Sequence, residues 1–195
     1  MASVVIAGDT SGTVTLAAPA VAGTTTLTLP TANGTVITTG SSGQSIPKAA
    51  LPTGSVLQVV NVAYSTTQST TSGTLADTGL SASITPTSSS SKILVLIDHC
   101  GCRVQPTTSM RGAIVLLRGS TQILVLDTLV GFTGTTNNNA IGSVSANYLD
   151  SPATTSSVTY KTQFAVDSGS GTFYLNNSGS TGQPNSTITL MEIAA

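Results

Sequence analysis

The chain has very few charged and aromatic side chains. Charged residues make up 7% of its 195 residues, aromatic residues make up 4%, and tryptophan is absent. The formal net charge is −1 and the six Lys and Arg residues are scattered, which excludes the basic surface that nucleic-acid binding requires. The apolar blocks at 93–97, 113–117 and 123–126 are far shorter than a membrane-spanning helix. We therefore expect neither nucleic-acid binding nor membrane insertion.

An active site is equally hard to assemble from this composition. The chain has seven acidic residues and one histidine. Four of the acids lie in turn-like contexts, where local hydrogen bonding accounts for them. A glycosidase needs a positioned pair of carboxyl groups, and the sequence indicates no such pair. The sequence therefore predicts a protein that is not an enzyme and needs no cofactor. The four acids in turn-like contexts are Asp9, Asp77, Asp150 and Asp167.

The two cysteines, Cys100 and Cys102, lie two positions apart in an apolar segment. On a regular strand, residues i and i+2 point to the same face, whereas His99 would point to the opposite one. This alternation argues against a zinc site, which normally takes four ligands. A disulfide at this spacing would need a distorted backbone. We expect two reduced, partly buried thiols and no metal site.

What the chain does have is hydroxyl groups and aliphatic side chains in alternation. Serine and threonine together account for about a third of the residues, and hydrophobic residues still reach 39%. Short runs in which these two classes alternate are typical of β-strands with one face covered by small hydroxyls. No segment shows the periodicity of an amphipathic helix. The sequence therefore predicts an all-β protein of the extracellular or virion kind.

The composition divides the chain into three parts. Residues 1–40 form a short N-terminal hairpin or shaft segment, and residues 41–54, rich in Gly, Ser and Pro, form a linker. Residues 55–195 contain eight or nine longer strands, whose regular spacing favours a β-sandwich of the jelly-roll type. Apolar residues are nearly continuous at 92–103, which predicts a strand buried on both faces.

The strands of residues 1–40 are too short to be stable alone. An Asn-Gly pair at 33–34 predicts a hairpin turn between two of them. We expect the aliphatic residues of this segment to attach the protein to a larger particle, and threefold self-association to close the exposed strand edges. The candidate attachment residues are Val4, Ile6, Val14, Leu16, Leu27 and Leu29.

Four segments resemble fibre proteins of marine phages. Residues 8–30 and 54–60 are similar to segments common in tail-fibre and related virion proteins. Residues 83–95 (SITPTSSSSKILV) and 188–193 (ITLMEI) are similar to the knob domain of the same group. The resemblance implies a virion-located homotrimer that binds other virion proteins of the tail or capsid through a β-rich N-terminal part. A C-terminal β-sandwich knob would contact the host surface.

The resemblance leaves two roles open. The chain is short for a tail fibre and has almost no shaft, which favours the alternative of a head fibre or capsid decoration protein that ornaments or stabilises the shell. A carbohydrate-processing appendage is the rival from another class, and the missing carboxylate pair argues against it.

The knob is expected to recognise a host glycan or protein through polar, glycine-rich loops, because loops commonly carry recognition. Tyr148 and Tyr174 are candidates for a sugar-contacting surface, since tyrosine is enriched at binding surfaces. The candidate host-contact residues are Phe132, Asn137, Asn138, Asn139, Tyr148, Tyr174 and Asn177.

Overall fold

A computed structural model of the protein describes residues 3–7, 13–17, 51–177 and 182–195. The chain divides into two compact units, Met1–Ser45 and Ile46–Ala195. In the first unit, β1 (Ser3–Ala7) and β2 (Thr13–Ala17) form an antiparallel pair. Both strands were expected from their alternating residues, whereas the hairpin turn predicted at 33–34 lies outside the described residues.

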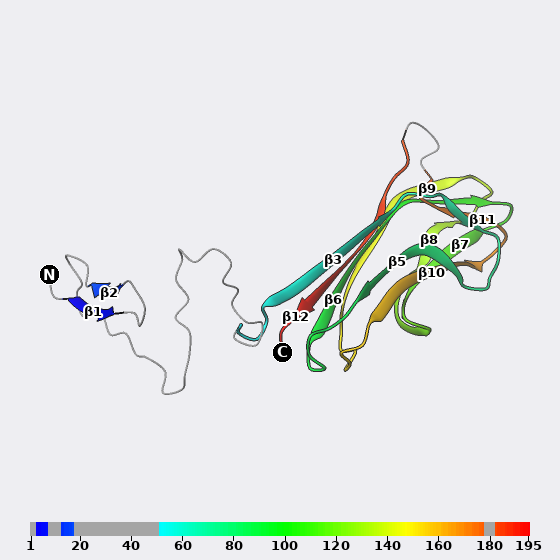
Figure 1. The fold of residues 1–195 in the computed structure, drawn as a ribbon. Helices are drawn as coiled ribbons and strands as arrows, with labels where there is room; N and C mark the ends of the chain where they lie inside the picture. The colour runs from blue at the N-terminus through cyan, green and yellow to red at the C-terminus, as the bar shows by residue number, and fades with distance from the viewer. Residues whose placement is uncertain (1–2, 8–12, 18–50, 178–181) are drawn as a thin grey trace. The chain divides into compact units, whose positions relative to one another are not determined.

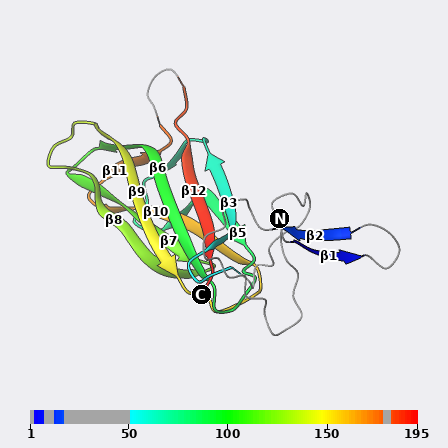
Figure 2. The ribbon, with the colours of Figure 1, turned by 90° about the vertical axis from the view of Figure 1, so that its left-hand side faces the viewer.

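The second unit is a β-sandwich of two antiparallel sheets, one of six strands and one of four, which confirms the all-β prediction (Figure 1). Figure 2 shows β9, β6, β12 and β3 side by side in the six-stranded sheet. In that sheet, β9 pairs with one edge of β6, while β12 and β11 pair with its other edge. The four-stranded sheet has the order β5-β10-β7-β8. The strands are β3 (Val56–Tyr64), β4 (Gln68–Thr70), β5 (Ala76–Ile84), β6 (Lys92–Pro106), β7 (Met110–Arg118), β8 (Thr121–Thr133), β9 (Asn139–Asp150), β10 (Val158–Ser168), β11 (Gly171–Leu175) and β12 (Ser186–Ile193).

Two clusters of buried side chains fill the space between the sheets. One surrounds Tyr160 and includes Leu80, Ile93 and Leu190. In the other, the rings of Phe164 and Phe173 meet edge to face with their centroids 5.7 Å apart. Every second residue of a strand contributes to these clusters, as the pleat of a sandwich strand requires.

The alternation of β6 breaks at Gly101. The register between β6 and β9 shifts between His99 and Cys102, and Gly101 has a φ of +60°. Past this bulge, Cys102 is buried on the same side as His99, whereas Cys100 remains partly exposed. The expectation that both thiols share a face opposite to the histidine is therefore wrong, because a bulge inserts an extra residue into the alternation.

The outward face of β6 is also more open than the sequence predicts. Ile93 and Val95, which point into the sandwich, are fully buried, whereas Leu94 and Leu96 on the other face are only partly covered. The prediction of a strand buried on both faces is wrong for the single chain, because no layer of the described residues covers that face of the six-stranded sheet. An apolar strand face is thus left partly open to solvent.

Gly101 provides a test of the bulge. A Cβ at this position would lie 2.6 Å from Pro184 Cγ and 2.7 Å from the Asn177 nitrogen, whereas Gly119 has the same φ of +60° with open space around it. We expect Gly119→Ala to lower the free energy of unfolding by about 1–2 kcal/mol, the cost of a left-handed backbone alone. Gly101→Ala adds a clash with the backbone and should cost about 3 kcal/mol or more.

Urea unfolding of both variants at neutral pH measures this difference. Because the two glycines share one backbone conformation, Gly119→Ala is the matched control for strain without crowding. Equal losses in the two variants would contradict the tight packing of residues 176, 177 and 184 against the bulge.

Candidate functional site

A continuous row of apolar side chains crosses the outer face of the six-stranded sheet. The register places Val59 opposite Met191, Met191 opposite Leu94, and Leu94 opposite Leu149. Residues directly opposite each other in adjacent strands project to the same face. Val59 and Leu149 are each 55% exposed, and the two residues between them are partly exposed. We call Val59, Leu94, Leu149 and Met191 the apolar row.

The outer face of the four-stranded sheet is different in kind. Lys161 Nζ lies 2.9 Å from the carboxylate of Asp77, and Gln163 Nε2 donates a hydrogen bond of 2.7 Å to the same group. Arg111 pairs with Asp167 nearby. These hydrogen bonds lower the pKa of Asp77, with that from Gln163 contributing most. This face therefore carries ion pairs and hydrogen-bonded polar groups, together with the exposed Val125, which the register places in line with Gln163 across Val115.

A second exposed apolar group lies at one edge of the sandwich. β8 is the last strand of the four-stranded sheet, and β9 lies beside it at the margin of the six-stranded sheet. Leu129 and Phe132 on β8 are 56% and 57% exposed. Val125 on β8 and Ile141 on β9 are also exposed. We call Val125, Leu129, Phe132 and Ile141 the edge patch.

Several predicted host-contact residues gather at one end of the sandwich. Tyr174 on β11 lies opposite Arg103 of β6, whose guanidinium is 5.9 Å from the tyrosine ring centroid. Arg103 Nη1 also donates to Asn177 Oδ1 at 3.4 Å. Arg103, Tyr174 and Asn177 thus form one connected polar group, which we call the polar end.

The remaining candidates belong to the β8–β9 connection or to the core. Asn137 and Asn138 are exposed in the loop, and Asn139 begins β9, where its Nδ2 donates to the carbonyl oxygens of Gly131 and Phe132 at 3.3 Å. Asn139 pairs with Val104 in the sheet, so this loop ends beside the end of β6 that carries Arg103. Tyr148 is the exception, because it packs against the core cluster around Tyr160.

The predicted attachment residues fall partly within the described chain. Val4 lies opposite Leu16, and Ile6 lies opposite Val14, so the β1–β2 register brings these four positions together. Leu27 and Leu29 lie outside the described residues.

Most polar groups inside the sandwich are hydrogen-bonded to one another. Arg118 Nη1 donates to both carboxylate oxygens of Asp150 at 3.0 Å, and the Tyr160 hydroxyl donates to the same carboxylate at 2.7 Å. Burial, together with the adjacent Asp150, raises the pKa of Tyr160 far above its usual range. These residues come from β7, β9 and β10, so the cluster ties the two sheets together rather than facing a cleft.

Glu192 is a second buried carboxylate with a structural role. Its oxygens accept hydrogen bonds from the Thr87 nitrogen at 2.6 Å, the Thr87 hydroxyl at 2.7 Å and Gln58 Nε2 at 2.6 Å. Burial alone would raise the pKa of Glu192, but these hydrogen bonds outweigh it and lower the pKa. The carboxylate therefore fixes the β5–β6 connection onto β12.

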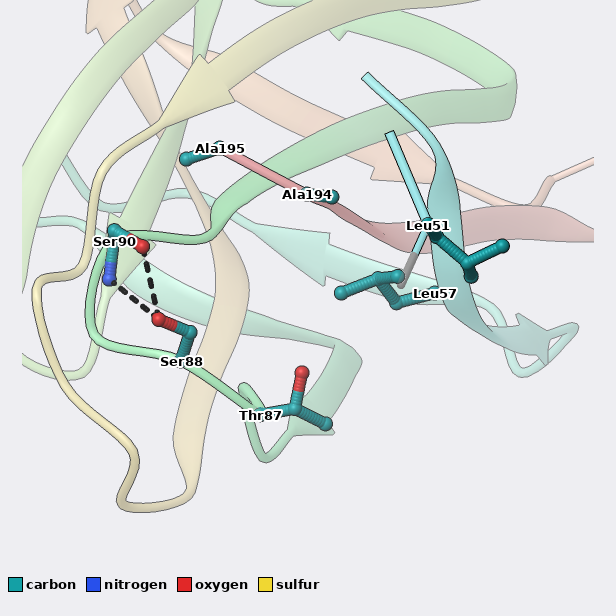
Figure 3. A pocket seen from close by; sticks show the side chains of 7 residues that line it. All are labelled: Leu51, Leu57, Thr87, Ser88, Ser90, Ala194 and Ala195. Atoms are coloured by element: carbon teal, nitrogen blue, oxygen red, sulfur yellow. Dashed lines mark hydrogen bonds between the residues drawn. The ribbon is translucent and has the colours of Figure 1, made fainter. Parts of the chain in front are cut away.

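Near the Thr87 connection is a pocket of about 430 Å³. Ser88 and Ser90 are hydrogen-bonded to each other on one side of it, and Leu51 and Leu57 lie on another (Figure 3). Among the described residues, no Asp, Glu, His, Cys, Lys or Arg side chain lines it. These lining side chains offer hydroxyls and aliphatic surface.

His99 is a buried titratable group on the inward face of β6. It is 1% exposed; its Nε2 lies 3.0 Å from Thr162 Oγ1, which is 2.6 Å from Thr78 Oγ1. Its Nδ1 has no hydrogen-bond partner among the described residues. Burial lowers the pKa of His99 to about 4, although the neighbouring Asp98 carboxylate acts in the opposite direction. His99 is therefore neutral at physiological pH and sealed from any substrate.

Within the described residues, the side chains do not form a recognisable reaction centre. No three His, Cys, Asp or Glu residues of this part of the chain are grouped to hold a metal ion. Burial raises the pKa of Cys102 to about 12, which disfavours a reactive thiolate. None of the described residues forms a helix of the length and hydrophobicity needed to cross a bilayer. The exposed features that remain as candidates are the apolar row, the edge patch and the polar end.

Sequence reasoning missed the apolar row and all of the edge patch except Phe132. The row joins residues from β3, β12, β6 and β9, which are up to 132 positions apart in the chain, so the register had to be known first. The signal that was available is the doubly apolar segment at 92–103, which predicted a partner layer on both faces of β6.

Comparisons with known proteins assign no family to the chain. A scan of the chain against protein-family models finds no match, and a search of curated proteins finds no matching relative.

The buried histidine predicts a pH-dependent stability. The pKa of His99 is about 4 in the folded protein and 6.5 as the ordinary value. Between these values the unfolded chain binds a proton that the folded chain does not, so stability falls as the pH is lowered. We expect a loss of about 3 kcal/mol in the free energy of unfolding from pH 7 to pH 4, nearly all of it below pH 6.5.

Urea titrations at intervals from pH 7.5 to pH 4.5 measure this slope. His99→Gln is the control, since its amide can still bond to Thr162 but does not titrate. Stopping at pH 4.5 limits the contribution of Asp and Glu groups. A wild-type curve as flat as that of the variant would contradict a neutral, buried His99.

Proposed function

We propose that the protein is a non-enzymatic structural component of a phage virion, a homotrimeric fibre. The N-terminal residues 1–40 attach it to other virion proteins, and the sandwich at 55–195 contacts the host surface. The observation that carries this proposal is the apolar row, an uncovered hydrophobic strip on a protein without a grouped set of catalytic side chains among its described residues. A face of this kind is typical of a protein–protein contact.

The path of the chain supports a jelly-roll fold for the sandwich. β3 and β4 lie in the six-stranded sheet, β5 in the other, β6 in the first again, and β7 and β8 in the second. The chain then returns to the six-stranded sheet with β9, enters the four-stranded sheet with β10, and ends in the six-stranded sheet with β11 and β12. Apart from the short β4 and β11, the sandwich has eight strands, four in each sheet. This arrangement favours a jelly roll, an architecture common in viral capsid and lectin domains.

The polar end supports a role in adhesion. Arg103, Tyr174 and Asn177 form a connected group at the end of β6 where the β8–β9 loop ends. With 7% charged residues, the protein can do little electrostatic steering, so recognition rests on shape, stacking and hydrogen bonds. A host glycan fits this chemistry well, because sugars present hydroxyls and apolar ring faces.

The proposal predicts the mass of the assembly and the place of the protein on the virion. The full chain should elute with a light-scattering mass three times its 19.4 kDa. Gold-labelled antibody should bind fibres on intact particles, and added pure protein should reduce adsorption to host cells. Arg103→Ala, which removes the cation from the polar end, should weaken that competition while leaving the mass unchanged.

Two results would decide against this function. Labelling spread over the capsid shell, with no competition for adsorption, would indicate a capsid decoration protein instead. A monomer at micromolar concentration would contradict the homotrimer.

A further inference from the structure

We propose that the polar end binds a sugar that carries a carboxylate group, and that Arg103 is the residue that recognises the carboxylate. The inference rests on the proposed function, because it names the class of host glycan that this end would contact. The ligand is therefore an acidic sugar, and a neutral sugar of the same shape binds less well.

Arg103 carries a positive charge that has no opposite charge among the described residues. The ion pairs there use Arg111, Arg118 and Lys161 as their cations, and Arg103 belongs to none of them. A guanidinium keeps its charge at every physiological pH, so the missing partner cannot be replaced by loss of a proton. In a chain with 7% charged residues, an anionic ligand would supply that partner.

Most of the hydrogen-bonding capacity of Arg103 is also free. Its Nη1 donates to Asn177 Oδ1 at 3.4 Å, whereas Nε and Nη2 have no acceptor within the described part of the chain. These two nitrogens lie along one edge of the guanidinium. Such an edge matches the two oxygens of a carboxylate and binds them through parallel hydrogen bonds. The free donors therefore favour a carboxylate over a single neutral hydroxyl.

The guanidinium is held in place before a ligand arrives. It lies 5.9 Å from the ring centroid of Tyr174, whose hydroxyl donates to Gln105 Oε1 at 3.3 Å. Arg103 and Gln105 flank the fully buried Val104 on β6, so both project to the outer face of the sheet. Side chains that already have their binding geometry lose less conformational entropy when a ligand binds.

Neutral polar groups beside Arg103 fit the rest of a sugar. Ser69 of β4 lies opposite Tyr174, and Thr172 of β11 lies opposite Gln105. Ser69 and Gln105 are exposed, and Thr172 is partly exposed. Their hydroxyl and amide groups both donate and accept hydrogen bonds, as sugar hydroxyls do. The polar end thus places one anion-binding group among several neutral ones, which is the combination that an acidic sugar presents.

Lys92 provides a matched control on the same strand. It lies at the start of β6, far along the strand from Arg103, and it also has no ion pair among the described residues. Its Nζ donates to the Ser151 hydroxyl at 2.8 Å. Removing Lys92 changes the net charge as much as removing Arg103 does, but it leaves the polar end intact.

Binding of the full chain to polygalacturonate and to its methyl ester tests the role of the carboxylate. The two polymers share one sugar backbone, and only the first is charged. Biolayer interferometry at physiological salt should give an affinity for the acid about tenfold or more above that for the ester, the effect of one hydrogen-bonded charge pair.

Three variants then assign this preference to a residue. Arg103→Gln should abolish the preference for the acid, and Arg103→Lys should restore only part of it, because an ammonium keeps the charge but lacks the planar fork. Lys92→Gln should keep the full preference. The ratio of the two affinities is measured within each variant, so a small loss of stability does not affect the comparison.

Equal affinity of the wild-type chain for acid and ester would overturn the inference. Equal losses of preference in Arg103→Gln and Lys92→Gln would also overturn it, since charge alone would then attract the polymer. A wild-type preference in Arg103→Lys would contradict recognition by the planar fork.

The inference and the proposed function fail on different results. A protein that labels virion fibres and competes for adsorption, but binds acid and ester equally, would keep the function and reject the acidic sugar. A protein that is absent from virions, but shows the preference that depends on Arg103, would reject the function and keep the site.

Discussion

The structure depends on β6, a strand with apolar side chains on both of its faces. Its inward residues, Ile93, Val95 and Ile97, belong to the core between the sheets. Its outward residues, Leu94 and Leu96, have no covering layer among the described residues. At about 25 cal/mol per Å² of apolar surface, leaving such a face in water forfeits stabilisation that a second layer would supply. A strand of this composition is therefore better suited to an assembly than to a single chain.

Because the chain has so few charged residues, the two buried carboxylates of its described part have a large influence on how distant segments are held together. Asp150 is held by Arg118 and Tyr160, and Glu192 by Thr87 and Gln58, so each buried carboxylate has its hydrogen-bond partners in place. Both join segments that are distant in sequence, and leaving either carboxylate unpaired would carry a large desolvation cost. Polar groups thus specify how the sheets and the β5–β6 connection align, while the aliphatic residues supply most of the burial.

Local alternation was enough to predict most strands but not the way in which they combine. The sequence predicted eight or nine strands in residues 55–195, and the structure has ten strands there, β3 to β12. β4 was missed, since Gln68–Thr70 has no apolar residue. The bulge at Gly101 was missed because a glycine in a strand is compatible with either a regular or a bulged backbone.

The sequence did not reveal the candidate site either, because local patterns do not show how distant strands are aligned. Phe132 was selected as a loop residue and Tyr174 as a sugar-contacting tyrosine. Both are at least partly exposed, but Phe132 lies on β8, and Tyr148, the other tyrosine selected, packs against the core. Its strand, β9, alternates the apolar residues Val144, Ala146 and Tyr148 with polar ones, so this pattern could have indicated that Tyr148 faces the core. The apolar row requires four strands in register, and register over such sequence distances is a property of the fold.

A homotrimer, as proposed, would also explain how so weakly charged a protein adheres to a host. Phe132 lies near the end of β8 from which the loop to β9 leaves, and that loop ends at Asn139, beside the end of β6 that carries Arg103. Three copies of this polar end would then belong to one assembly. Each copy alone would bind a polar ligand weakly, because hydrogen bonds made in water give little net affinity. Three linked sites convert weak contacts into a strong one through effective concentration, without electrostatic attraction.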